Sequence, residues 1–241
     1  MRILAFDTAT PRTAVALRDI DTGANVCMLS ELDLTAADDP PVGSRPGHAQ
    51  RLLSLIDGLM VRGGTDWSSI DRIAVGAGPG TFTGLRIGIA SAQALAAARA
   101  LPLAGVSTLR SLALAAHDRR PQRATLAVID ARRGEAFVAG WAGGEDPLCA
   151  AATLSACVLT PEQLARVAGA TAAGTQAVGD GALKFRELLE AAGVTVPHGE
   201  SQLHRVSARE HCRLGALAQP SADGRIEPDY LRVPDAEVAK G

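Results

Sequence analysis

The sequence predicts an α/β protein with two similar lobes. Candidate strands and helices alternate along the 241 residues, an order that is typical of mixed α/β proteins. A strand, an aspartate, a turn and a second strand occur twice, first around Asp7 and again around Asp130. This repeat favours two lobes that begin alike, although a repeated pattern alone does not establish a duplication.

The composition is that of a globular chain with an apolar core. Hydrophobic residues make up 47% and charged residues 21% of the chain, which excludes overall disorder. The 24 lysines and arginines nearly balance the 26 aspartates and glutamates, so no global positive field attracts nucleic acid. Aromatic residues reach only 3%, too few for a base-stacking surface. A stand-alone nucleic-acid binder is therefore disfavoured.

The cysteine pattern favours a cytoplasmic protein, and the apolar segments indicate neither a signal peptide nor a membrane span. The four cysteines include no Cys-x-x-Cys pair, and ordinary thiols in a reducing compartment fit best. Asp7 interrupts the apolar stretch that a secretory signal would need, so we expect no signal peptide. The most apolar window, residues 85–103, contains two arginines and a glutamine. Because such side chains are costly at a bilayer centre, we expect no membrane contact.

Apolar patterning and turn residues predict the N-terminal elements. Residues 2–8 and 13–18 read as two strands joined by a tight turn. A third strand is predicted at residues 25–32, and a loop rich in Asp, Pro, Gly and Ser follows at residues 36–47. From His48 the apolar residues recur at helical spacing until a glycine pair, residues 63–64, ends the pattern.

A glycine-rich segment then joins a buried strand to a helix. The strand is predicted at residues 71–76, and the segment at residues 76–88 leads into a helix that ends near Arg99. Small residues line this helix, so a neighbouring element can approach it closely. A strand at residues 103–106 and a helix at residues 108–117 complete the first half.

The second half begins with the same pattern of two strands, at residues 124–130 and 136–141. A helix starts at Thr160 by the rules for N-caps and first turns. A strand at residues 176–181 ends in a turn, and a helix follows at residues 182–192. The last predicted elements are a helix at residues 207–217 and a proline-broken tail.

These elements divide the chain into lobes. We expect an N-terminal lobe at residues 1–110, a C-terminal lobe at residues 111–206 and a tail at residues 219–241. The late helix, about residues 207–218, is expected to pack back on the N-terminal lobe.

The glycine-rich segment, residues 76–88, is hereafter called the glycine motif. It is no Walker A loop, because Lys and Ser/Thr do not follow its glycines, and it lacks the spacing of a dinucleotide fingerprint. Glycines at a strand-to-helix turn can expose backbone amides to an anion. They can equally allow tight packing between elements. The residues alone leave both explanations open.

Residues 78–88 resemble the signature of the bacterial TsaB family. Residues 4–10, 130–135, 179–181 and 230–232 follow in the order of the family, so the resemblance covers nearly the whole chain. It implies an actin-like, Hsp70-like, sugar-kinase-like fold of the ribonuclease-H-like class, with two similar lobes. It also implies kinship with the catalytic subunit TsaD. The signature positions are Gly78, Pro79, Gly80, Thr81, Phe82, Thr83, Gly84 and Arg86.

The resemblance implies a non-catalytic, accessory role in threonylcarbamoylation of the tRNA adenosine next to the anticodon. The chain is expected to bind and stabilise TsaD in a heterodimer, with TsaE in a larger complex and with tRNA contacted only indirectly. Alone, it is expected to form a homodimer. No metal or cofactor is expected, and the resemblance leaves open vestigial nucleotide binding at the TsaD interface.

Two departures from the catalytic relatives agree with this role. The related ATPases open with Asp-x-Gly-Ser/Thr, in which glycine lets the first hairpin wrap phosphate, but here Ala9 occupies the glycine position. The catalytic relatives also carry His-x-x-x-His for a metal ion, whereas here Leu52 follows His48 at that spacing. His48 is therefore expected to make only a structural hydrogen bond. The degenerate phosphate region consists of Asp7, Thr8 and Thr10.

The two helices of the first lobe are the surface on which the resemblance places TsaD. We expect each helix to bury one face against its own sheet and to present part of the other face to the partner. The alternative is that both helices only cover the sheet. The expected interface residues are Ala49, Leu52, Leu53, Ile56, Leu59, Ile89, Ala92 and Ala96.

Other functions receive weaker support. No protease or hydrolase motif occurs, and the strand-terminal Asp7 and Asp130 more often cap turns than act in catalysis. Five arginines at residues 119–123 and 132–133 could form a small tRNA-facing patch, although arginines in loops are usually solvated. The main alternative is an independent ATP-dependent small-molecule kinase of the same fold. A stand-alone tRNA binder is a third possibility, against which the charge balance argues.

Overall fold

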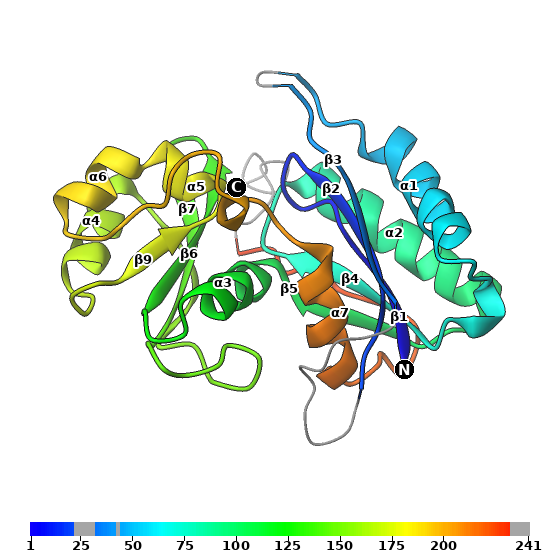
Figure 1. Ribbon diagram of the computed structural model, residues 1–241. Helices are drawn as coiled ribbons and strands as arrows, with labels where there is room; N and C mark the ends of the chain where they lie inside the picture. The colour runs from blue at the N-terminus through cyan, green and yellow to red at the C-terminus, as the bar shows by residue number, and fades with distance from the viewer. Residues whose placement is uncertain (22–31, 42–43, 232–241) are drawn as a thin grey trace. The chain divides into compact units, whose positions relative to one another are not determined.

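The computed structural model describes residues 1–21, 32–41 and 44–231 as an α/β protein with two mixed sheets (Figure 1). The chain divides into two compact units. Of the described residues, those within Met1–Thr108 and Ser207–Asp229 form unit 1, and Leu109–Val206 with Tyr230 and Leu231 form unit 2. No helix among the described residues is long and apolar enough to cross a membrane.

Unit 1 is built around a five-stranded sheet. In spatial order its strands are β3 (Asp33–Asp38), β2 (Thr13–Asp19), β1 (Arg2–Asp7), β4 (Arg72–Gly78) and β5 (Leu103–Ser107). The pairs β1–β2 and β2–β3 are antiparallel, whereas β1, β4 and β5 run parallel. The carboxyl ends of these three parallel strands therefore meet at one edge of the sheet.

Helices cover both faces of this sheet (Figure 1). Helices α1 (His48–Arg62) and α2 (Phe82–Arg99) lie on one face, and α7 (Ala208–Leu217) lies on the other. Successive residues of β4 face opposite sides of the sheet: Val75 lies near Gly88 of α2, and Ala74 packs against Gly215 of α7. The strand is consequently buried on both faces, as its nearly continuous apolar run predicts.

The third strand lies later in the chain than the patterning predicts. Most of the predicted strand at residues 25–32 falls outside the described residues, and the predicted start of the loop at residue 36 is wrong. Ala36, Ala37 and Asp38 instead pair with residues of β2. β3 is an edge strand whose residues alternate between exposed and partly buried. Such a strand tolerates polar residues, and a run of polar residues in the sequence resembles a loop.

Unit 2 repeats the arrangement with four strands. In spatial order they are β8 (Leu154–Leu159), β7 (Glu135–Trp141), β6 (Thr125–Arg132) and β9 (Gln176–Val178). β6 pairs antiparallel with β7, β7 pairs antiparallel with β8, and β6 pairs parallel with β9. This order matches that of β3, β2, β1 and β4, so the two units share one strand plan. The sequence patterning missed β8, which is a partly exposed edge strand.

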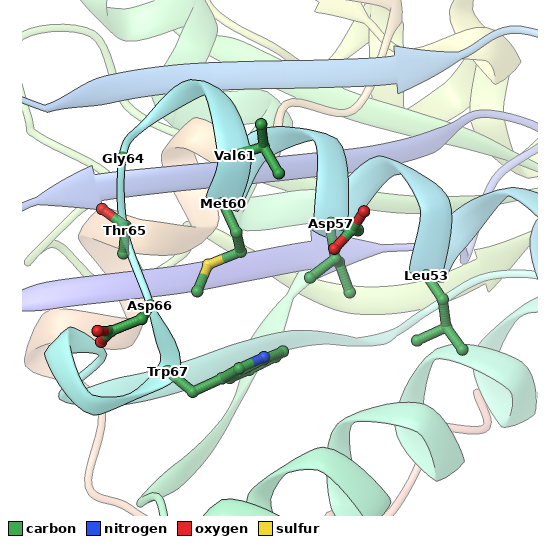
Figure 2. A pocket seen from close by; sticks show the side chains of 9 residues that line it. Leu53, Asp57, Met60, Val61, Gly64, Thr65, Asp66 and Trp67 are labelled. Carbon is green, nitrogen blue, oxygen red and sulfur yellow. The ribbon is translucent and has the colours of Figure 1, made fainter.

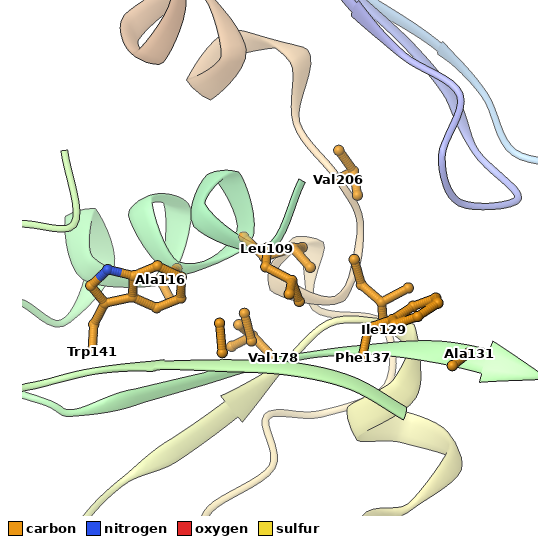
Figure 3. Close-up of a cluster of buried hydrophobic side chains, with 12 residues drawn as sticks. Leu109, Ala116, Ile129, Ala131, Phe137, Trp141, Val178 and Val206 are labelled. Atoms are coloured by element: carbon orange, nitrogen blue, oxygen red, sulfur yellow. The ribbon is translucent and has the colours of Figure 1, made fainter. Parts of the chain in front are cut away.

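The sheet of unit 2 separates two apolar cores. Helix α3 (Thr108–Arg119) covers one face, where Figure 3 shows Ala116 beside Trp141, and Leu109 near Val178 and Ile129. The other face packs against helices α4 (Pro161–Gly169), α5 (Asp180–Lys184) and α6 (Arg186–Ala191). The single helix predicted at residues 182–192 is thus two short helices, which meet at Phe185.

Arg72 fastens the end of α7 to the sheet of unit 1. Its Nη1 donates hydrogen bonds to the carbonyl oxygens of Gly215, Ala216 and Ala218 at 2.6, 3.3 and 2.9 Å. These carbonyls lie at the C-terminal end of α7, where no further helical turn supplies amide donors to them. A cation is therefore favourable at this position.

We predict that Arg72→Ala lowers the free energy of unfolding by about 1–3 kcal/mol, because these carbonyls lose their charged donor. Urea unfolding of the full chain measures the change. The matched control is Arg166→Ala, which removes an exposed guanidinium with one long bond of 3.4 Å to the Glu162 carbonyl. An Arg72→Ala variant as stable as this control would contradict the prediction.

Candidate functional site

The glycine motif leads from the end of β4 into α2 and packs on residues 7–9, where β1 ends. A side-chain carbon at Gly76 would overlap the Asp7 carboxylate, and one at Gly84 would overlap the Thr8 carbonyl oxygen. At Gly80 it would lie 2.5 Å from the Cβ of Ala9. Real Cβ atoms do not approach so closely. The structure therefore supports the packing explanation for Gly76, Gly80 and Gly84.

Hydrogen bonds join the same two segments. The Thr8 hydroxyl donates to the Gly84 carbonyl at 2.7 Å, and the Thr81 amide donates to the Ala9 carbonyl at 2.7 Å. Four consecutive residues, Asp7, Thr8, Ala9 and Thr10, are each 6% exposed or less. The predicted degenerate phosphate region is thus enclosed by protein, and the side chains of Asp7 and Thr8 are engaged within the chain.

Asp7 lies at the centre of this enclosure. Its Oδ2 accepts hydrogen bonds from the Thr108 hydroxyl and from His211 Nε2, both at 2.9 Å, and its Oδ1 accepts one from the Ala9 amide at 2.7 Å. Burial alone would raise the pKa of Asp7. The hydrogen bonds and the charge of His211 outweigh burial and hold that pKa below its ordinary value.

The His211 ring spans two acceptors. Nε2 faces the Asp7 carboxylate, and Nδ1 lies 3.2 Å from the Ser207 carbonyl oxygen, which can only accept. The ring therefore bridges the Asp7 carboxylate and the backbone at the start of α7. Both side chains are fully buried, and this contact holds the Asp7 carboxylate within the fold.

Sequence reasoning missed both partners of Asp7. Thr108 directly follows β5, and the carboxyl ends of parallel strands meet at one edge, so the strand pattern could have placed it there. His211 is 204 residues away from Asp7 in the sequence. No spacing rule connects two residues so far apart, and only the packing of α7 brings them together.

Asp130 occupies in unit 2 the place that Asp7 occupies in unit 1. Lys184 Nζ contacts its Oδ1 at 2.6 Å, and Arg132 Nη1 contacts its Oδ2 at 3.3 Å. The Asp130 amide donates to Asp180 Oδ1 at 3.2 Å. Asp7 and Asp130 therefore both contact basic side chains of their own unit.

His48 is buried at the start of α1. Its Nδ1 lies 2.8 Å from the Thr13 hydroxyl, and burial lowers the pKa of the ring, so it is neutral near pH 7. Leu52, at the position of the second imidazole of the catalytic relatives, packs in the core. Among the residues that the structure describes, no three His, Cys, Asp or Glu side chains are grouped so that they could hold a metal ion.

Burial divides the expected interface residues into two groups. Side chains that are 4% exposed or less belong to the core of this chain. Ala49 and Leu53 remain at the surface, and Leu53 is 57% exposed. The buried residues are Leu52, Ile56, Leu59, Ile89, Ala92 and Ala96, and Ile56 also lines the pocket described next. Their contact with a partner stays a prediction.

A pocket of about 490 Å³ opens beside the C-terminal half of α1. Figure 2 shows Leu53 directed from α1 toward α2 and Met60 directed toward Trp67, which begins the short helix η1 (Trp67–Ser69). The Arg99 guanidinium lies 5.1 Å from the centre of the Trp67 ring. Asp57 and Val61 also line the pocket, and Val61 is 73% exposed. Sequence reasoning missed this pocket.

The arginines considered for a tRNA-facing patch do not form one surface. Arg119, Arg120 and Arg123 precede β6, whereas Arg132 and Arg133 lie where β6 ends. A strand of this length spans about 23 Å at roughly 3.3 Å per residue. The structure therefore separates the five arginines into two small groups at opposite ends of the strand.

Comparisons with known proteins agree with this architecture. The protein-family model for TsaD, tRNA N6-adenosine threonylcarbamoyltransferase, matches residues 40–173. The tRNA threonylcarbamoyladenosine biosynthesis protein TsaB of Escherichia coli is 33% identical over 96% of this chain and 95% of its own length. YeaZ from Pseudomonas aeruginosa superposes with a TM-score of 0.74 at 29% identity, covering 95% of this chain and 99% of its own.

A second solved structure from Pseudomonas aeruginosa, described as similar to peptidase YeaZ, gives the same TM-score of 0.74. It is 30% identical and covers 96% of this chain and 99% of its own. These likenesses extend over both units, so they support the actin-like fold for the whole chain.

We predict that Gly84→Ala lowers the free energy of unfolding by at least about 2 kcal/mol, because its new carbon overlaps the Thr8 carbonyl. Chemical unfolding measures the loss. The control is Gly58→Ala in α1, where an added carbon meets nothing within 4 Å and a gain of about 0.5–1 kcal/mol is expected. Equal effects of the two substitutions would refute tight packing as the role of Gly84.

A second prediction concerns Asp180. Burial raises its pKa to about 6, and the Asp130 charge acts in the same direction, against the hydrogen bond from the Asp130 amide. The pKa of Asp180 in the folded protein lies above its ordinary value of 3.8, so the protonated carboxyl favours the folded state. This contribution to stability is complete below pH 3.8 and is lost as the pH rises toward 6.

Asp180→Asn keeps the acceptor oxygen without the charge. We predict that it raises the free energy of unfolding at pH 7.5 by about 1–2 kcal/mol, and that the gain disappears near pH 4. Thermal or urea unfolding across this range measures the difference. A gain of the same size at both pH values would argue against titration of Asp180.

Proposed function

Because the chain belongs to the TsaB family of tRNA threonylcarbamoyladenosine biosynthesis proteins, we propose that it is a non-catalytic accessory subunit. It binds the catalytic subunit TsaD and stabilises the active arrangement of TsaD. The reaction takes place in the cytoplasm, where the free thiols of Cys149, Cys157 and Cys212 stay reduced.

The enclosure of residues 7–10 carries this proposal. A kinase of the same fold needs room for phosphate at the first hairpin, but here the glycine motif fills that room and Asp7 is engaged by Thr108 and His211. Opening the site would leave the buried Asp7 carboxylate without the hydrogen bonds of His211 and Thr108, which is strongly unfavourable. This observation supports an accessory subunit over the kinase alternative.

In the proposed mechanism, TsaD transfers the threonylcarbamoyl group from threonylcarbamoyl-adenylate to the tRNA adenosine. This chain supplies no reacting group and acts through binding energy, since a ligand shifts its partner toward the conformation that it binds better. TsaE joins a larger complex, and tRNA is contacted through the partners. The chain itself requires no cofactor.

The partner surface is the outward side of α1. Ala49, Leu53, Asp57 and Val61 are spaced four residues apart, so they form one stripe along the helix, hereafter the outer stripe. Leu53 and Val61 are large apolar side chains exposed to solvent. Exposed apolar groups beside a pocket are typical of binding surfaces.

We predict that Leu53→Glu weakens TsaD binding by more than about tenfold, since a carboxylate would be buried among apolar groups. Val61→Glu should act in the same way. Calorimetry or sedimentation with purified TsaD measures the affinity.

The matched control is Leu217→Glu. Leu217 is 45% exposed at the end of α7, on the other face of the sheet. This substitution introduces the same charge and should leave binding unchanged. If all three variants bind TsaD as wild type does, the partner surface lies elsewhere.

The accessory role itself is tested by assaying tRNA modification with TsaD and its other partners, with and without this chain. Activity should depend on the chain and should fall with Leu53→Glu in proportion to lost binding. Modification that proceeds equally well without the chain would overturn the proposed function. Tight nucleotide binding with phosphoryl transfer by the isolated chain would favour the kinase instead.

A further inference from the structure

Asp57 is a charged residue among apolar ones on the outer stripe. It lies one helical turn from Leu53 and one turn from Val61, and it lines the pocket with both. The residues three and four positions away on α1 include no cation. Within the described part of the chain, no ion pair engages its carboxylate. The stripe therefore presents an unpaired negative charge between two apolar side chains.

The arginines of α1 are directed away from this stripe. Arg51 Nε lies 3.7 Å from Asp38 Oδ1, and Arg62 Nη2 donates to the Thr35 carbonyl at 2.9 Å. Both contacts are made to β3, so the basic residues of the helix serve the edge of its own sheet. The basic and acidic groups of α1 are thus on different sides of the helix.

A second carboxylate lies at the rim of the pocket. Asp66 accepts hydrogen bonds from the hydroxyls of Ser68 and Ser69, and these bonds lower its pKa. It is therefore ionised at neutral pH. Asp57 and Asp66 thus place two carboxylates at the rim of an apolar recess, whose Trp67 ring also lies 5.1 Å from the Arg99 guanidinium. The Asp57 side of the rim favours a partner that brings a cation.

Covering Asp57 with an apolar surface is unfavourable, because a carboxylate that leaves water without a partner loses its hydration. A second copy that pairs stripe against stripe brings no cation to Asp57. Pairing about a twofold axis brings identical patches together, and the stripe contains no basic residue. The Asp57 charge therefore disfavours pairing of one stripe with another and favours a partner that brings a cation.

We propose that Asp57 selects the heterologous partner over a second copy of this chain. The matching surface is a helix of another protein with an arginine or lysine flanked by apolar residues at helical spacing. Its cation meets Asp57, and its apolar side chains pack on Leu53 and in the recess beside Trp67. This inference rests on the proposed function, which supplies TsaD as that protein.

The test compares two associations of the same variants. TsaD binding is measured by calorimetry, and self-association by sedimentation equilibrium, for wild type and Asp57→Asn at low and high salt. We expect Asp57→Asn to weaken TsaD binding about tenfold and to reduce its salt dependence. Self-association should stay equal or become tighter.

Glu187→Gln on α6 is the control, since it removes an exposed helical carboxylate and changes the net charge equally. It should alter neither association. Unchanged TsaD binding by Asp57→Asn, or self-association weakened to the same extent, would overturn the inference.

The outcomes separate this inference from the proposed function. If wild type binds TsaD and Leu53→Glu does not, while Asp57→Asn binds normally, only the selection by Asp57 fails. If wild type does not bind TsaD at all, the proposed function and the inference fail together.

Discussion

The packing of the glycine motif on the end of β1 is the contact on which the rest of unit 1 depends. Gly76, Gly80 and Gly84 let the loop and α2 approach residues 7–9 more closely than any other side chain would allow. This approach sets the position of α2 against the sheet and closes the space beside the first hairpin. The Asp7–His211 pair then joins the same point to α7 on the opposite face.

A buried ion pair of this kind is weak evidence for stability, because removing both charges from water is costly. Its consequence here is geometric. Asp7 is held by three donors from the strand end, from α7 and from the residue after β5, so its carboxylate is not free to act on a bound group. In unit 2, Lys184 and Arg132 engage Asp130 in a similar way.

Periodicity and turn chemistry predicted most strands and helices, because each was long or bounded by glycine or proline. The edge strands β3 and β8 were displaced or missed, since edges carry polar residues that weaken the pattern. The burial of most predicted interface residues has a related reason. A helical apolar stripe such as that of Leu52 and Ile56 identifies the core-facing side, whereas a binding face is seen only after burial is known. His211 shows the limit of spacing rules, because tertiary packing alone brings it to Asp7.

The enclosed hairpin and the partner surface are two sides of one arrangement. The glycine packing that leaves no room for phosphate also fixes α2, and α2 borders the side of α1 on which Leu53 and the pocket lie. Room for a ligand at residues 8–10 would require α2 to move away from β1. Such a movement would reshape the recess between α1 and Trp67, since Arg99 of α2 packs on that ring. A chain that keeps this recess rigid for a partner therefore gives up the space that phosphate chemistry would need.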